Sequence, residues 1–285
     1  MKVTNIDLYK YFGWPKPNKY AKGILHGIFF DHDLDDTEMC PKRLHPIMLV
    51  IPGGGYHFVS QREANPVALA FLRHGFNAFW LDYSIAPKNK YPTMLVEAMM
   101  ALTYLYKKAE SMHSDPEKIT VSGFSAGGHL AGMLASLSEE EKQLFYPYGK
   151  CGAHLRSVVL GYPVVMDDTE GVSIRNLAGP EDPNPSRFCI TNRDLSSFPP
   201  CFIWTTKEDT VVDPTTNAQA LKDALDRNGV KCQLVLYPRG VHGLSTGDEN
   251  TYLDHWEDIN IRKEVFGWPE LAVEFINSVG GGIKD

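Results

Sequence analysis

Residues 119–128 read Ile-Thr-Val-Ser-Gly-Phe-Ser-Ala-Gly-Gly, a run that changes from bulky to small residues at Ser125. The β-branched residues at its start are typical of a buried strand, and the small residues after Ser125 are typical of a closely packed helix. Between them lies the pattern G-x-S-x-G, which predicts a serine on a sharp strand-to-helix turn, a nucleophile elbow. Gly123 and Gly127 are needed because side chains there would collide across the turn. The competing interpretation is a packing turn whose serine only caps the helix.

Similar apolar runs on either side of this stretch predict the rest of the sheet. With the strand at 119–122, they cover residues 46–51, 78–83, 157–162, 202–206 and 233–237, and a further β-like run covers 23–30 after an irregular start. Helical spacing recurs between them, over residues 63–74, 93–109, 125–136, 215–228 and 268–279. Strands that alternate with helices form βαβ units with right-handed crossovers. The sequence therefore predicts an α/β fold, a doubly wound, mostly parallel sheet with helices on both faces.

We expect one domain over residues 1–285, because no repeat or linker divides the chain. Residues 163–200 interrupt the regular alternation, being rich in Pro, Asn, Asp and Gly without a clear period. Such a long connection is usually functional, so we expect an insertion over the strand ends and the active site. The acidic run 31–36 resembles a calcium loop. However, Asp36 and Lys42 occupy the glycine and glutamate positions, which favours a solvated loop.

Composition limits the classes of function. The net charge of −7 argues against a nucleic-acid binder, and no apolar stretch is long enough to cross a bilayer. The five cysteines are scattered without a CxxC pair, which predicts free thiols, no zinc site and, with no secretory signal at the start, a cytoplasmic protein. The sequence leaves open whether the chain forms a homo-oligomer.

A glycine run directly after strand 46–51 predicts the site of an oxyanion. Residues 52–56 read Pro-Gly-Gly-Gly-Tyr. Backbone N–H groups suit a developing oxyanion because they are fixed in place and uncharged. In hydrolases built on such a sheet, this loop and the residue after the nucleophile form the oxyanion hole, which predicts Gly54, Gly55 and Ala126. A phosphate loop is a poor alternative, because no G-K-[S/T] follows. Tyr56 and Phe58 adjoin these glycines and are predicted to line the substrate pocket.

The base and the acid are expected in the order Ser, acid, His. His242 lies in a glycine-flanked loop after the last strand, whereas His255 lies in an amphipathic stretch, so His242 is the predicted base. Asp209 and Asp213 both follow strand 202–206. Asp213 precedes Pro214 and a helix, as an N-cap would, so Asp209 is the predicted partner of His242.

Taken together, these motifs resemble the α/β-hydrolase esterases of the hormone-sensitive-lipase and acetyl-xylan-esterase kind, over about residues 46–244. The matching segments are PGGGY at 52–56, DYSIAP at 82–87, GFSAGGHL at 123–130, EDTVV at 208–212 and VHGL at 241–244. Lipase-like members usually carry His where this chain has Pro52, which is closer to bacterial acetyl esterases acting on xylan fragments.

The resemblance implies a carboxylic ester hydrolase that needs no metal or cofactor. Its substrates would be short-acyl esters, above all acetyl esters, with an acetylated oligosaccharide as one candidate. An amidase, peptidase or formamidase on the same fold is the first alternative. The second is a non-catalytic relative that only binds a ligand.

Overall fold

The computed structural model describes residues 1–30, 44–145, 152–166, 172–251 and 263–283. One eight-stranded sheet runs through them in the order β1-β2-β4-β3-β5-β6-β7-β8. Its strands are β1 (Lys2–Asp7), β2 (Ile24–Phe29), β3 (His45–Ile51), β4 (Asn77–Asp82), β5 (Ser114–Phe124), β6 (Ser157–Gly161), β7 (Cys201–Thr206) and β8 (Cys232–Tyr237). The strands from β4 to β8 pair in parallel, as the unbroken apolar runs predict.

The N-terminal end of the sheet differs from the prediction. The irregular start expected there contains β1 and the short helix α1 (Leu8–Phe12), which Asp7 caps by accepting a hydrogen bond from the Lys10 amide. Both β1 and β2 join the sheet antiparallel. β1 lies at the edge and is largely exposed, so it lacks the apolar run that reveals a buried strand.

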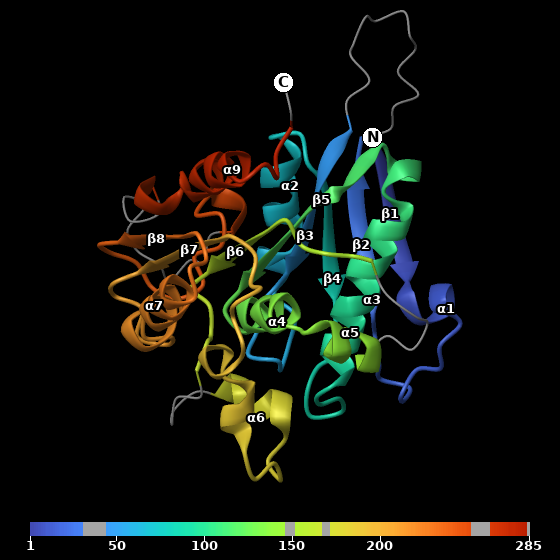
Figure 1. The fold of residues 1–285 in the computed structure, drawn as a ribbon, viewed down its shortest axis with the longest axis horizontal. Helices are drawn as coiled ribbons and strands as arrows, with labels where there is room; N and C mark the ends of the chain where they lie inside the picture. Colours follow the sequence, from blue (N-terminus) through green and yellow to red (C-terminus); the bar gives the residue numbers. More distant parts are fainter. Residues whose placement is uncertain (31–43, 146–151, 167–171, 252–262, 284–285) are drawn as a thin grey trace, which may run out of the picture.

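The helices confirm the predicted alternation, with small shifts at their ends. They are α2 (Asn65–Leu72), α3 (Thr93–Lys108), α4 (Ala126–Ala135), α5 (Glu139–Phe145), α6 (Val172–Ala178), α7 (Ala220–Arg227) and α9 (Trp268–Ser278). A 3₁₀ turn, η2 (Gln61–Glu63), precedes α2, and a π-helical turn, η6 (Thr215–Gln219), precedes α7. α2 and α9 lie along one side of the sheet, with α4 and α7 along the other (Figure 1).

Both faces of the central strands are buried, and the alternation of side chains along β3 shows how. Met48 and Val50 pack in a cluster with α2 and α9, whereas Leu49 and Ile51 pack in a cluster with α3 and α4. Each strand side chain therefore has a helix to pack against, which explains the continuous apolar runs. Within the described residues, no helix is both long and apolar enough to span a bilayer.

The segment 163–200 contains α6 and two 3₁₀ turns, η4 (Pro185–Phe188) and η5 (Ile190–Asn192). In Figure 1, α6 lies at the opposite end of the molecule from the N-terminus. The single domain and the role of this segment as an insertion remain predictions. The acidic run 31–36 lies outside the described residues.

Candidate active site

Ser125 lies on a strained turn between β5 and α4. Its φ of 52° is in the left-handed region, which non-glycine residues rarely adopt. A Cβ at Gly123 would lie 2.4 Å from the Gly127 carbonyl oxygen, and one at Gly127 would lie 2.2 Å from the Ile51 carbonyl oxygen. The expected need for glycine is therefore confirmed. At Gly127, however, the obstacle is the end of β3 instead of the turn itself.

Three of the predicted residues form one hydrogen-bonded line. His242 Nε2 lies 2.9 Å from Ser125 Oγ, and His242 Nδ1 lies 2.7 Å from Asp209 Oδ2. Because a carboxylate only accepts, Nδ1–H donates to Asp209, which leaves Nε2 of the neutral imidazole to accept the Ser125 hydroxyl proton. The three residues follow β5, β7 and β8, whose carboxyl ends meet at one edge of the sheet.

The two candidate acids have different partners. Asp209 is buried, and its Oδ1 accepts hydrogen bonds from the amides of Val211 and Val212 at 3.0 and 2.9 Å. The carboxylate is thus held from one side while its other oxygen faces His242. Asp213 is exposed and accepts from the amides of Thr215 and Thr216, as the predicted helix cap would. The competing histidine, His255, lies outside the described residues.

The predicted oxyanion-hole amides lie on the loop after β3 and at the start of α4. Gly54 and Gly55 have φ of 120° and 60°, and a Cβ on Gly54 would lie 2.2 Å from the Phe58 carbonyl oxygen. The N–H groups of Gly54, Gly55 and Ala126 have no hydrogen-bond partner among the described residues. They are therefore available to a negatively charged oxygen.

The two predicted pocket walls differ from each other. Phe58 is 57% exposed, so its ring is open to a ligand. Tyr56 is fully buried, and its hydroxyl donates to His129 Nδ1 at 2.8 Å. The other nitrogen of His129 donates to the Phe188 carbonyl, and burial lowers the pKa of His129 to about 4, so the ring stays neutral. Because Tyr56 is buried, the structure gives no support to the prediction that it lines the substrate pocket. Tyr56 braces the glycine loop on α4 instead.

Several residues that hold these loops belong to none of the sequence motifs. The Asn176 side chain of α6 donates to the Gly55 carbonyl at 2.7 Å, which ties segment 163–200 to the glycine loop. Glu63, at the end of η2, accepts one buried hydrogen bond from the Gly53 amide of the glycine loop and another from the hydroxyl of Tyr162, which follows β6. A glutamate within the apolar period of residues 63–74 was the available signal, but it reads equally well as the acidic first turn of a helix.

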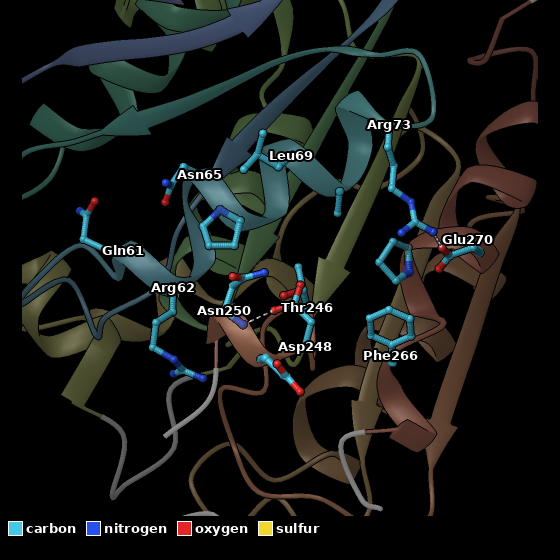
Figure 2. Close-up of a pocket in the computed structure, with 14 residues that line it drawn as sticks. Gln61, Arg62, Asn65, Leu69, Arg73, Thr246, Asp248, Asn250, Phe266 and Glu270 are labelled. Carbon is cyan, nitrogen blue, oxygen red and sulfur yellow. Dashed lines mark hydrogen bonds and ion pairs between the residues drawn. The ribbon is translucent and has the colours of Figure 1, made fainter. Parts of the chain in front are cut away.

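A cavity of about 770 Å³ lies beside α2 and α9 (Figure 2). Its lining combines polar residues from η2, α2 and residues 246–250 with the apolar side chains of Leu69, Phe266 and Pro269. Ser125, Asp209 and His242 do not line it, so it is separate from the hydrogen-bonded line. Among the described residues, no group of three His, Cys, Asp or Glu side chains is placed to hold a metal ion.

Comparison with known proteins places this geometry in a family. Residues 48–246 match the family described as "alpha/beta hydrolase fold". Endo-1,4-beta-xylanase B of Butyrivibrio fibrisolvens is 34% identical over 72% of this chain and 33% of its own length. The acetylxylan esterase of Xylanibacter ruminicola is 27% identical over 82% of this chain and 48% of its own length. This chain therefore spans only a third to a half of these two relatives.

A solved structure matches nearly the whole chain. The acetyl ester-xyloside bifunctional hydrolase of Caldicellulosiruptor lactoaceticus is 26% identical, with a TM-score of 0.77 over 98% of this chain and 97% of its own. The family match covers more than half of the chain and includes the segments that carry Ser125, Asp209 and His242. The chain therefore belongs to the family of proteins with the alpha/beta hydrolase fold.

Proposed function

We propose that this protein is a serine carboxylesterase that hydrolyses short-acyl esters through an acyl-enzyme. The line from Ser125 through His242 to Asp209 is the observation that carries this proposal. A serine hydroxyl is a weak nucleophile until a positioned base takes its proton, and such a base must lie about 2.6–3.2 Å away. The 2.9 Å between His242 Nε2 and Ser125 Oγ meets that requirement.

In the proposed first step, Ser125 Oγ attacks the ester carbonyl carbon while its proton moves to His242 Nε2. Asp209 holds the imidazole through Nδ1–H and stabilises the imidazolium that forms. The amides of Gly54, Gly55 and Ala126 stabilise the negative oxygen of the tetrahedral intermediate. When the intermediate collapses, the C–O bond to the alcohol breaks and His242 returns the proton to the departing oxygen.

Water then releases the acyl group by the same route. His242 takes a proton from water as its oxygen attacks the acyl carbon, and the second tetrahedral intermediate expels Ser125 Oγ, which regains the proton. The products are the carboxylic acid and free enzyme. The N-terminal end of α4 points its free N–H groups at the reacting centre, which favours the negative charge in both steps.

For the substrate, we propose acetyl esters, with acetylated xylan fragments or other carbohydrates as the alcohol portion. Two of the similar proteins carry acetyl ester or acetylxylan in their names, which supports this choice. An exposed aromatic ring beside the glycine loop, Phe58, would offer an apolar face to a sugar. An amidase on the same fold would cleave the matching amide, so matched ester and amide substrates belong in the test.

The test uses purified protein with p-nitrophenyl acetate, butyrate and octanoate, a matched anilide, and acetylated xylo-oligosaccharides. We expect kcat/KM to fall from acetyl to octanoyl, and the ester to be cleaved faster than the anilide. Ser125→Ala should lower kcat by about 10⁶-fold and abolish labelling by a fluorophosphonate. Full labelling of Ser125→Ala would refute the serine mechanism, and faster cleavage of the octanoyl ester would refute the short-acyl preference.

A further inference from the structure

Glu63 is a buried carboxylate beside the site that the mechanism above does not use. It ends the η2 turn between β3 and α2, and its side chain is 4% exposed. Burying a carboxylate is costly unless hydrogen bonds satisfy its oxygens. Both of its oxygens have donors, and the two donors belong to different parts of the site.

One oxygen holds the glycine loop. Glu63 Oε2 accepts a hydrogen bond from the Gly53 amide at 2.8 Å. Gly53 directly precedes the free amide of Gly54. A Cβ at Gly53 would lie 2.8 Å from Glu63 Oε2 and 3.0 Å from Ser125 Cβ, so this glycine separates the carboxylate from the nucleophile. The orientation of the Gly53 peptide sets the start of the loop on which the oxyanion amides lie.

The other oxygen holds the loop of the base, through Tyr162. The Tyr162 hydroxyl donates to Glu63 Oε1 at 2.7 Å and accepts from the Ser245 amide at 2.9 Å. Its ring packs edge-on against His242, with centroids 4.9 Å apart. Burial and the neighbouring Glu63 raise the pKa of Tyr162, so its hydroxyl keeps the proton that it donates.

The η2 turn itself contacts the same histidine loop. The Ser245 hydroxyl donates to the Arg62 carbonyl at 2.5 Å, and Arg62 Nη2 donates to the Gly243 carbonyl at 3.0 Å. Arg62 lies beside Asn250 in Figure 2. Gly243 directly follows His242 in the sequence. The turn therefore lies between the two loops that must meet Ser125 in the correct geometry.

We propose that Glu63 is a positioning residue that fixes the position of the glycine loop relative to the His242 loop. The proposal rests on the function proposed above. A tetrahedral intermediate needs both the oxyanion amides and the imidazole within about 0.5 Å of their working positions. One carboxylate bonded directly to the glycine loop and, through Tyr162, to the His242 loop fixes their separation before substrate arrives.

The first test removes both bonds. Glu63→Ala should lower kcat for p-nitrophenyl acetate by about 10- to 100-fold while KM changes by less than about threefold, because the lost alignment matters most in the transition state. Glu63→Gln should recover part of the activity. Its amide oxygen can accept from Gly53 N–H, but its NH₂ faces a Tyr162 hydroxyl whose own proton then has no acceptor. Should Glu63→Ala not fold, Glu63→Asp replaces it, because its shorter side chain cannot reach both donors.

A double-mutant cycle separates the two bonds. Tyr162→Phe removes the bond to the histidine loop and leaves the Gly53 bond, so its kcat should fall less than that of Glu63→Ala. The double variant should keep more activity than the product of the two single losses predicts, because the bond from Tyr162 to Glu63 is lost in both single variants and only the Ser245 bond is lost in addition. Losses that multiply would show independent roles and overturn the proposal.

The matched control is Glu97→Ala, which removes another fully buried glutamate, one bonded to Tyr9 and Ser84. Its kcat should stay within about twofold of wild type below its melting temperature. Equal losses of kcat in the Glu97 and Glu63 variants would indicate general destabilisation and refute a positioning role. If Ser125→Ala abolishes activity and Glu63→Ala keeps kcat within twofold of wild type, only the Glu63 proposal fails. If Ser125→Ala stays active, the proposed function fails.

Discussion

Asp209 and Asp213 lie four residues apart on one loop, yet their carboxylates have different partners. Asp209 accepts two backbone amides through one oxygen and faces His242 with the other. Asp213 accepts hydrogen bonds through one oxygen from the amides of Thr215 and Thr216. At the scale of the residue, the role of each acid follows from which donors reach it, because each carboxylate oxygen has a limited number of lone pairs.

Replacing each acid by its amide tests this assignment. Asp209→Asn should lower kcat by about 10³- to 10⁴-fold, because its NH₂ group cannot accept from Nδ1–H and favours the wrong imidazole tautomer. Asp213→Asn should leave kcat within about twofold of wild type, since Asn caps a helix nearly as well as Asp. Steady-state kinetics with p-nitrophenyl acetate measures both. A larger loss in Asp213→Asn would reverse the assignment.

The position of the nucleophile depends on how closely α4 approaches the end of β3. A Cβ at Gly127 would lie 2.2 and 2.3 Å from the carbonyl oxygens of Ile51 and Pro52. These atoms belong to the backbone, so they cannot rotate away as the end of a flexible side chain could. At the scale of the element, the glycine therefore serves the contact between a helix and a strand that also leads into the oxyanion loop.

Gly127→Ala should lower the free energy of unfolding by about 1–3 kcal/mol, the usual cost of overpacking a close contact. Urea denaturation followed by circular dichroism measures this change. Gly267→Ala is the control, because Gly267 has an ordinary φ of −83° and open space around its Cβ position. Its free energy of unfolding should change by less than about 1 kcal/mol. Similar losses in both variants would show that the close approach at Gly127 is not the cause.

In the whole molecule, a buried carboxyl group joins the N-terminal helix α1 to α3 and to the loop after β4. Glu97 on α3 accepts hydrogen bonds from the Tyr9 hydroxyl of α1 and from the amide and hydroxyl of Ser84, which follows β4. Burial raises the pKa of Glu97 from 4.5 to about 7, although the hydrogen bonds from Ser84 and Tyr9 act in the opposite direction. A raised carboxyl pKa means that the folded state favours the protonated form.

The contribution of Glu97 to stability therefore has a defined pH dependence. It is fully present below pH 4.5, declines as the pH rises from 4.5 to 7, and is constant above that range. Glu97→Gln cannot ionise, and its amide can donate to the hydroxyls of Tyr9 and Ser84. The free energy of unfolding of Glu97→Gln minus that of wild type should rise by about 2–3 kcal/mol between pH 4.5 and pH 7.5. Urea titrations at several pH values measure it, and a difference independent of pH would contradict the prediction.

Much of the fold was determined by the sequence itself. The unbroken apolar runs of the strands from β3 to β7 exist because both faces of these strands are buried, so their pattern alone predicts a parallel sheet between helices. The glycines around Ser125 predict the sharp turn, because only glycine tolerates such close backbone contacts. The edge strand β1 was not predicted, because an exposed strand does not need apolar side chains.

Which side chains meet depends on the tertiary structure. Ser125, Asp209 and His242 come together only through the order of strands β5, β7 and β8 and the loops after them. The burial of Tyr56 against His129 and the two bonds of Glu63 join segments far apart in the chain. Local patterns record how each segment packs, whereas hydrogen bonds between distant loops depend on where the fold places them. Ångström distances of that kind leave no periodic signal in a sequence.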